Sequence, residues 1–84
     1  MYILSCGNKK KIGVTSNIEK RIKALQTGNA ERIVLEYIEE RLNPTKAESF
    51  LHRYFAKRRK VGEWFEDITV NEIRSRLMLF FDQD

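Results

Sequence analysis

The sequence has 84 residues, of which 42% are hydrophobic and 33% are charged. This length and composition predict a single domain over residues 1–84. No apolar run approaches the roughly 20 residues that a membrane-spanning helix requires, so no membrane contact is expected. Cys6 is the only cysteine, which excludes an internal disulfide and predicts a reduced, cytoplasmic protein.

Charge is unevenly distributed along the chain, whose formal net charge is +4. Residues 1–30 carry six basic residues and one acidic residue, and residues 47–62 carry five basic residues and one acidic residue. Residues 63–84 carry six acidic and two basic residues instead. We expect the two basic segments to form one polyanion-binding face, on the same side as Arg21, with the acidic segment turned away. A solvated helix surface is the alternative interpretation of the same charges.

The first elements in the chain are predicted to form a β-hairpin. Residues 2–5 and 11–14 have strand-like composition, and Gly7-Asn8 between them is a typical turn signal. The second strand begins within a run of three lysines, although strands usually avoid like charges. This position suggests that the cation of Lys11 serves a function.

A helix is predicted over residues 17–27. Ser16 with Glu19 three positions later forms a capping-box pattern at its start, and Gly28 is a plausible stop. The apolar residues of this segment recur at helical spacing, which predicts one core-facing side. They are Ile18, Ile22 and Leu25.

The second half of the chain predicts a third strand over residues 31–40 and a helix over residues 44–58, which begins at Asn43-Pro44. Residues 61–66 are expected to form a loop or a short extended piece. A second capping box, formed by Thr69 and Glu72, opens a last helix over residues 70–82.

This order of elements predicts an α+β fold in which helices flank a small three-stranded antiparallel sheet. The run Leu77–Phe81 is apolar on more than one side of its predicted helix. The chain is therefore expected to be a monomer or a weak homodimer that associates through this run.

Five polar residues lie beside apolar faces or enter strands, and they are the candidates for chemistry. They are Tyr2, Lys11, Arg21, Glu48 and His52. A tyrosine can deprotonate water or act as a nucleophile, an arginine can hold a phosphate, and one glutamate can bind Mg²⁺, which keeps most of its waters. Within a hairpin, the cation of Lys11 can favour the phenolate form of Tyr2. Each residue taken singly also has an ordinary structural explanation, but the set predicts cleavage of phosphodiester bonds.

Five short motifs in this order resemble the GIY-YIG nuclease superfamily, most closely its compact branch in phage and bacterial proteins. They are MYIL, KIGVT, NIEKRIKAL, KAESFLHRYF and GEWFE, and the resemblance covers about residues 1 to 68. It implies that Tyr2 is the tyrosine of the first motif, that Arg21 binds phosphate and that Glu48 binds a divalent metal ion. Lys11 stands where the second motif commonly has a tyrosine.

The resemblance also assigns roles to two further residues. His52 matches a histidine that is frequent in the compact branch, as a phosphate contact or a proton carrier. Gly13 would be the glycine of the second motif, which allows close approach of backbone or of a helix. The implied catalytic set is therefore Tyr2, Lys11, Arg21, His52 and Glu48, with Glu48 as the metal ligand.

The resemblance implies a metal-dependent endonuclease or nickase that acts on DNA with Mg²⁺ or Mn²⁺ as cofactor, and it leaves RNA open as a substrate. The basic residues expected to contact nucleic acid are Lys9, Lys10, Lys20, Lys23, Arg53, Lys57 and Arg58. Two other functions remain open on this sequence. One is a catalytically inactive nucleic-acid-binding module of the same fold, and the other is a protein-interaction module.

Overall fold

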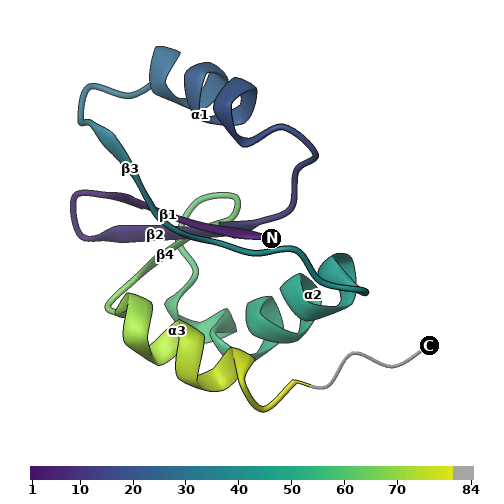
Figure 1. Ribbon diagram of the computed structural model, residues 1–84. Coiled ribbons are helices and arrows are strands. Elements are labelled where there is room, and N and C mark those ends of the chain that lie inside the picture. Colours follow the sequence, from purple (N-terminus) through teal and green to yellow (C-terminus); the bar gives the residue numbers. More distant parts are fainter. Residues whose placement is uncertain (81–84) are drawn as a thin grey trace.

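The computed structural model describes residues 1–80, which form a four-stranded antiparallel sheet with helices on both of its faces (Figure 1). The strands are β1 (Tyr2–Cys6), β2 (Lys9–Gly13), β3 (Ile33–Ile38) and β4 (Trp64–Glu66), in the spatial order β3-β1-β2-β4. The helices are α1 (Ile18–Thr27), α2 (Pro44–Tyr54) and α3 (Val70–Leu77), and a 3₁₀ turn, η1 (Ala56–Arg58), follows α2. The predicted α+β class is confirmed.

The sheet has one strand more than the sequence predicts. Residues 64–66 pair with β2 as strand β4, with Lys11 opposite Trp64 and Lys9 opposite Glu66. A strand of three residues is too short to show the alternation by which strands are recognised in a sequence. The predicted hairpin of β1 and β2 is present, and Gly7 in its turn has a φ of +61°.

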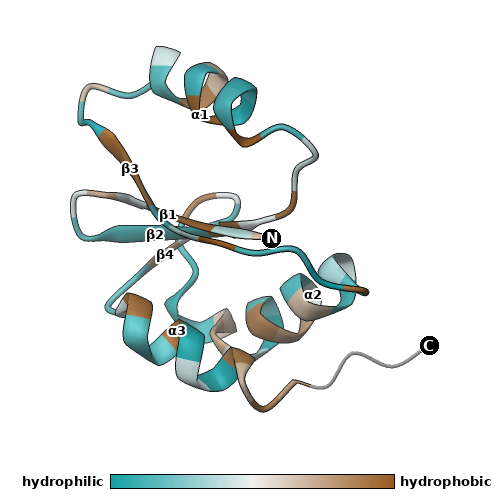
Figure 2. Cartoon of the chain, in the orientation of Figure 1, coloured by the Kyte–Doolittle hydropathy of each residue, from teal (hydrophilic) through white to brown (hydrophobic). Residues whose placement is uncertain are grey.

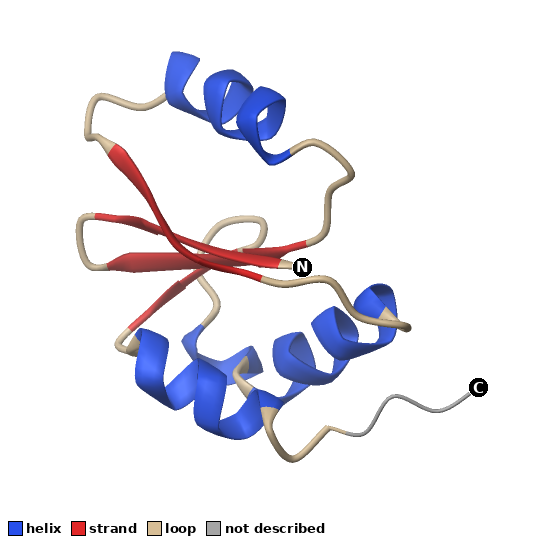
Figure 3. Ribbon diagram, viewed as in Figure 1, coloured by secondary structure: helices blue, strands red, loops and turns tan. Residues whose placement is uncertain are grey.

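Side chains alternate along β1 and divide the core into two layers. Tyr2, Leu4 and Cys6 belong to the layer covered by α1, whereas Ile3 belongs to the layer covered by α2 and α3. Figure 3 shows α1 alone on one side of the sheet and the other helices on the opposite side. The hydrophobic residues of α1 lie on the side that faces the sheet (Figure 2).

Helix α1 is less buried than α2 and α3, because none of its residues is fully buried. The side chain of Gln26 fastens its C-terminal end, since it donates to the Glu31 carbonyl and accepts from the Ile33 N–H, both at 2.8 Å. The N-cap is Asn17, whose Oδ1 accepts from the Lys20 N–H at 3.0 Å. The capping box predicted one residue earlier, at Ser16, is therefore wrong, because the asparagine side chain takes that place.

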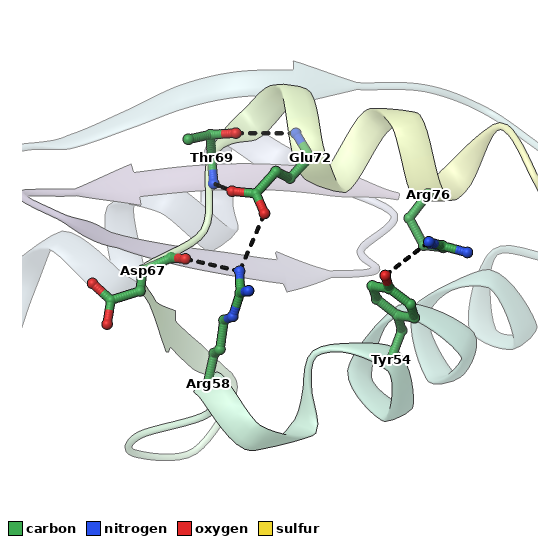
Figure 4. Close-up of polar contacts among 6 residues, drawn as sticks. All are labelled: Tyr54, Arg58, Asp67, Thr69, Glu72 and Arg76. Atoms are coloured by element: carbon green, nitrogen blue, oxygen red, sulfur yellow. Dashed lines mark hydrogen bonds and ion pairs between the residues drawn. The ribbon is translucent and has the colours of Figure 1, made fainter.

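Helix α3 is joined to the end of α2 by polar contacts that Figure 4 shows. The predicted capping box of Thr69 and Glu72 is present. Nη1 of Arg58 donates to the Asp67 carbonyl at 2.9 Å and to the Glu72 carboxylate at 3.1 Å. One turn further along, Arg76 donates to the Tyr54 hydroxyl at 2.7 Å.

Both later helices end before their predicted limits. Helix α2 stops at Tyr54 and continues as η1, and α3 stops at Leu77. Residues 81 and 82 of the predicted last helix lie outside the described part of the chain.

The run proposed as a dimer contact is divided between core and surface. Leu77 is buried in the core, and Phe80 packs against Phe50 with ring centroids 5.3 Å apart, whereas Met78 and Leu79 are exposed. Phe81 lies outside the described residues, so a homodimer through this run stays a prediction. Across residues 1–80, no helix is both long enough and apolar enough to pass through a bilayer.

Candidate active site

Tyr2 and Gly13 form the centre of the candidate site. Tyr2 is 1% exposed, and the two residues lie opposite each other in the β1–β2 register. A Cβ atom at position 13 would lie 2.4 Å from the Tyr2 hydroxyl oxygen and 2.5 Å from Cζ, so only glycine leaves room for the ring. The expected close approach at Gly13 is therefore present, but it is made by the Tyr2 ring rather than by backbone or a helix.

Arg21 is the cation that contacts Tyr2. Its Nε donates to the Tyr2 hydroxyl at 3.4 Å, and the rest of this exposed side chain faces solvent. The hydrogen bond to Tyr2 raises the pKa of Arg21, with further contributions from the charges of Tyr2 and Glu63 that outweigh burial. Arg21 is held here because its neighbours Ile18, Ile22 and Leu25 pack α1 against the sheet.

Lys11 lies within β2, as its strand-like context predicts, and is 5% exposed. Its Nζ lies 5.4 Å from the centroid of the Trp64 ring, a cation–π contact across the β2–β4 pair. Burial lowers the pKa of Lys11, Glu63 and Glu48 raise it, and Arg21 lowers it. In the hairpin Lys11 pairs with Leu4, so the contact with the Tyr2 hydroxyl is made by Arg21 instead.

Glu48 and His52 come from α2, where each follows a fully buried residue of the helix, Ala47 or Leu51. They therefore lie at the border of the core, one helical turn apart. Burial raises the pKa of the Glu48 carboxyl, as does Glu63, while His52 and Lys11 lower it. Within the described residues, no hydrogen bond or ion pair engages the Glu48 carboxylate, which leaves it available to a ligand.

The imidazole of His52 is oriented by the backbone of β2. Its Nε2 lies 2.8 Å from the Ile12 carbonyl oxygen, and its ring packs edge-on against Phe65 with centroids 5.1 Å apart. Because a carbonyl can only accept a hydrogen bond, Nε2 carries the proton. The second ring nitrogen, Nδ1, is therefore the one that can exchange a proton.

Tyr2 and Arg21 approach the end of β2 from one side of the sheet, and Glu48 and His52 approach it from the other. This is possible although α1 and α2 lie on opposite faces of the sheet. Strand β4 pairs with β2 only at residues 9–11, so Ile12 and Gly13 lie beyond the end of this pairing. There His52 reaches the Ile12 carbonyl from α2, and Tyr2 lies over Gly13 on the side of α1. The charges of Lys11 and Glu48 influence one another across this end of the strand.

Sequence reasoning missed Glu63, which influences the pKa of Lys11, Arg21 and Glu48. The signal was its position in the motif GEWFE, directly before Trp64, but its partners depend on the unpredicted strand β4. No group of three or more His, Cys, Asp or Glu side chains placed to bind a metal ion is found within residues 1–80.

The basic residues predicted to bind nucleic acid are divided between the two sides of the sheet. Lys20 and Lys23 are exposed on α1, and Arg53, Lys57 and Arg58 are exposed on α2 and η1. The prediction of one common face with Arg21 is therefore wrong, because the chain crosses to the other face of the sheet between α1 and α2 (Figure 1).

The remaining residues of this set differ in exposure and in the contacts they make. Lys9 is exposed and Lys10 is half-buried in β2. Arg58 also has the structural contacts with Asp67 and Glu72 described above. Binding of nucleic acid by any of these residues stays a prediction.

Comparison with known proteins identifies the family. No curated protein and no solved structure is significantly similar to the chain. The T5orf172 domain, a phage-associated domain often linked to nuclease-like proteins, matches residues 1–80. That match extends from the first motif around Tyr2 through the whole of α3, so this chain belongs to the T5orf172 domain family.

Proposed function

We propose that this protein is a metal-dependent endonuclease or nickase of the GIY-YIG type, which hydrolyses phosphodiester bonds in DNA. Its membership of a domain family linked to nuclease-like proteins supports this function. The observation that carries the proposal is the arrangement at the end of β2. There the Tyr2 hydroxyl is bonded by Arg21 beside Lys11, and the available carboxylate of Glu48 approaches from the other face.

Arg21 and Lys11 are the groups that would bind the scissile phosphate. The exposed guanidinium of Arg21 uses Nε for Tyr2, and its remaining N–H groups can donate to phosphate oxygens. Lys11 adds a second positive charge whose stem is enclosed by the sheet and Trp64. An incoming phosphodiester would reduce the repulsion between these two cations.

Glu48 is the group that would hold Mg²⁺ or Mn²⁺. The residues present fit such an ion, because Mg²⁺ usually takes one or two carboxylates and retains several waters. When bound, the ion supplies positive charge and Lewis acidity beside the phosphate. Glu48 must be ionised to bind it, although burial favours the protonated form.

Tyr2 would act as the base or the nucleophile. Its hydroxyl accepts a hydrogen bond from Arg21, so the guanidinium already lies beside the oxygen atom that would react. Of the two roles that the resemblance gives His52, the geometry favours the proton carrier. Its Nε2–H is directed at the Ile12 carbonyl, so Nδ1 is the nitrogen that accepts and releases protons.

The first test is cleavage of supercoiled plasmid by the purified protein in Mg²⁺, in Mn²⁺ and in EDTA, with a folded RNA of similar length as a second substrate. We expect open-circular or linear plasmid in the presence of either metal ion and none in EDTA. Binding of DNA without cleavage in any divalent ion would contradict the proposal. It would support a catalytically inactive nucleic-acid-binding module instead.

A further inference from the structure

The side chain of Lys11 lies on the face of the sheet that α1 covers. Lys11 is opposite Leu4 in the β1–β2 register, and Leu4 belongs with Tyr2 to the core layer beneath α1. Residues that are directly opposite each other in an antiparallel pair point to the same face. Lys11 therefore shares its face with the Tyr2 ring and with Arg21, which contacts the hydroxyl of that ring from α1.

Trp64 lies beside Lys11 on this face, and its backbone is bonded at both polar groups. It is opposite Lys11 in the β2–β4 pair and packs against the same core layer. Its N–H donates to the Val61 carbonyl at 3.0 Å, and its carbonyl accepts from the Lys60 N–H at 2.8 Å. The next residue, Phe65, is fully buried in the layer on the other face. A fixed backbone therefore carries the indole, and Trp64 itself is half-buried.

The Trp64 ring is the interaction partner of the Lys11 ammonium. Nζ lies 5.4 Å from the ring centroid, within the roughly 6 Å that cation–π contacts span. Lys11 is only 5% exposed, yet within the described residues no hydrogen bond or ion pair engages its ammonium. Lysines that are this deeply buried are normally paired with an opposite charge. At Lys11 an aromatic face takes the place of that counter-ion.

An aromatic partner leaves the ammonium available to an anion. A carboxylate in the same place would cancel the charge of Lys11 and would accept hydrogen bonds from its N–H groups. The face of an indole attracts a cation through the ring quadrupole and adds no net negative charge. Lys11 therefore keeps both its charge and its N–H donors for an incoming phosphate oxygen.

We propose that Trp64 is a positioning residue of the active site, whose indole face keeps the Lys11 ammonium charged and in place for the scissile phosphate. This inference rests on the proposed function, in which Lys11 binds that phosphate. Burial lowers the pKa of Lys11, so a partner that favours the charged form acts against this effect. The charged residues around Lys11 come from three other parts of the chain: Glu63 and Glu48 raise its pKa, and Arg21 lowers it.

The first experiment weakens the cation–π contact in the free protein without changing the shape of the site. Trp64 is the only tryptophan in the chain, so incorporation of fluorinated tryptophan alters this ring alone. Each added fluorine weakens the attraction of the ring for a cation. We expect the pKa of Lys11, followed by NMR of its side chain, to fall stepwise through mono-, di- and tetrafluorinated Trp64. An unchanged Lys11 titration across this series, with a native amide spectrum, would overturn the proposal.

The second experiment measures binding of duplex DNA in EDTA, which does not depend on cleavage. We expect tetrafluorinated Trp64 to weaken binding about 2–30-fold, the range that corresponds to loss of one cation–π contact. The same fluorines should have no effect in Lys11→Met, because the cation is absent there. An equal loss in both proteins would indicate a merely structural role of the ring, and no loss in either would also overturn the proposal.

Cleavage rates then distinguish this inference from the proposed function. At saturating DNA in Mn²⁺ we expect Trp64→Leu to cleave more slowly than the wild type, with partial rescue in Trp64→Phe, which keeps an aromatic face. Equal rates in Trp64→Leu and the wild type would contradict a part for Trp64 in the reaction. If the wild type does not cleave, the proposed function fails, while the Lys11 titration and the binding measurement still decide whether Trp64 holds the ammonium.

Discussion

At Glu48, the protonation state that stabilises the fold differs from the one that the proposed chemistry requires. Burial favours its protonated form, and Glu63 adds negative charge nearby, so its pKa is raised above the ordinary 4.5. A metal ion requires the ionised form. At neutral pH the folded protein therefore holds a carboxylate that it would be more stable without, which is common for groups kept for catalysis.

Glu48→Gln is expected to raise the melting temperature at pH 7.5. A carboxyl whose pKa is raised on folding destabilises the folded state at pH values above its folded pKa, and this cost disappears as the pH falls below the unfolded value. The gain should be a few degrees, because about 1 kcal/mol shifts the melting temperature of a domain of this size by about 4–8 °C. Thermal unfolding at pH 7.5 and pH 4 measures it, with exposed Glu36→Gln on β3 as the control. A gain of equal size at both pH values would contradict this account of Glu48.

Tyr2→Phe is expected to reduce cleavage about 100-fold or more while the fold is retained. The variant loses only the hydroxyl and its long hydrogen bond to Arg21, and the ring still fills the space over Gly13. Tyr54→Phe is the control, because its hydroxyl contacts Arg76 on the opposite face. Steady-state cleavage rates together with circular dichroism test this prediction. If Tyr2→Phe cleaves as fast as the wild type, the base is another group, and His52 is the next candidate.

At the scale of elements, the site is built by the hairpin and by one neighbour on each side. Strands β1 and β2 place Tyr2 over Gly13, and α1 brings Arg21 to the Tyr2 hydroxyl. Helix α2 brings Glu48 towards the end of β2 that extends beyond its pairing with β4. The short length of β4 matters for the site, because β2–β4 pairing that continued beyond residue 11 would cover the Ile12 carbonyl, which His52 binds.

Gly13→Ala is expected to destabilise the protein by about 1–3 kcal/mol, which is typical of overpacking in a well-packed core. The added methyl would lie 2.4 Å from the Tyr2 hydroxyl, so the ring must move away from Arg21. Gly28→Ala is the matched control, because no atom lies within 4 Å of a Cβ there and its φ is −96°. Urea unfolding of both variants tests the prediction. Equal stability of the two variants would show that the Tyr2 ring is not held against Gly13.

Sequence patterns were sufficient for the elements that depend on local spacing. The hairpin, the helix carrying Arg21 and the helix carrying Glu48 follow from turn signals and apolar periodicity. Strand β4 did not follow, because three residues carry no periodicity, and Glu63 was missed with it. The N-cap at Asn17 was misplaced by one residue, since Ser16 and Asn17 are both good caps.

For the whole molecule, the sheet separates the basic segments that the sequence suggested would act together. Which face a helix covers is a long-range property, because it depends on how the chain crosses the sheet and not on local spacing. The candidate site is not divided in this way, because it lies at the end of β2, which residues from both faces of the sheet approach. A duplex bound there would contact both flanks of the sheet.

DNA binding is expected to weaken with salt, with a log–log slope of about −0.9 for each phosphate neutralised. Lys20→Glu on α1 and Lys57→Glu on η1 should each weaken binding to all sequences alike and make the slope less steep. Lys57 is preferred to Arg58 for this test, because reversing Arg58 would break its contact with Glu72. An effect of Lys20→Glu alone would contradict binding along both flanks and confine DNA to the side of α1.

The most direct test of the central claim is single-turnover cleavage of a labelled DNA duplex in Mn²⁺ by the wild type, by Glu48→Gln and by the control Glu36→Gln. Glu36 is an exposed residue of β3, which is separated from β2 by β1. We predict that the wild type and Glu36→Gln cleave at similar rates, and that Glu48→Gln binds the duplex but cleaves it at least about 100-fold more slowly. Cleavage by Glu48→Gln at the wild-type rate would contradict a metal-dependent phosphodiesterase site at the end of β2.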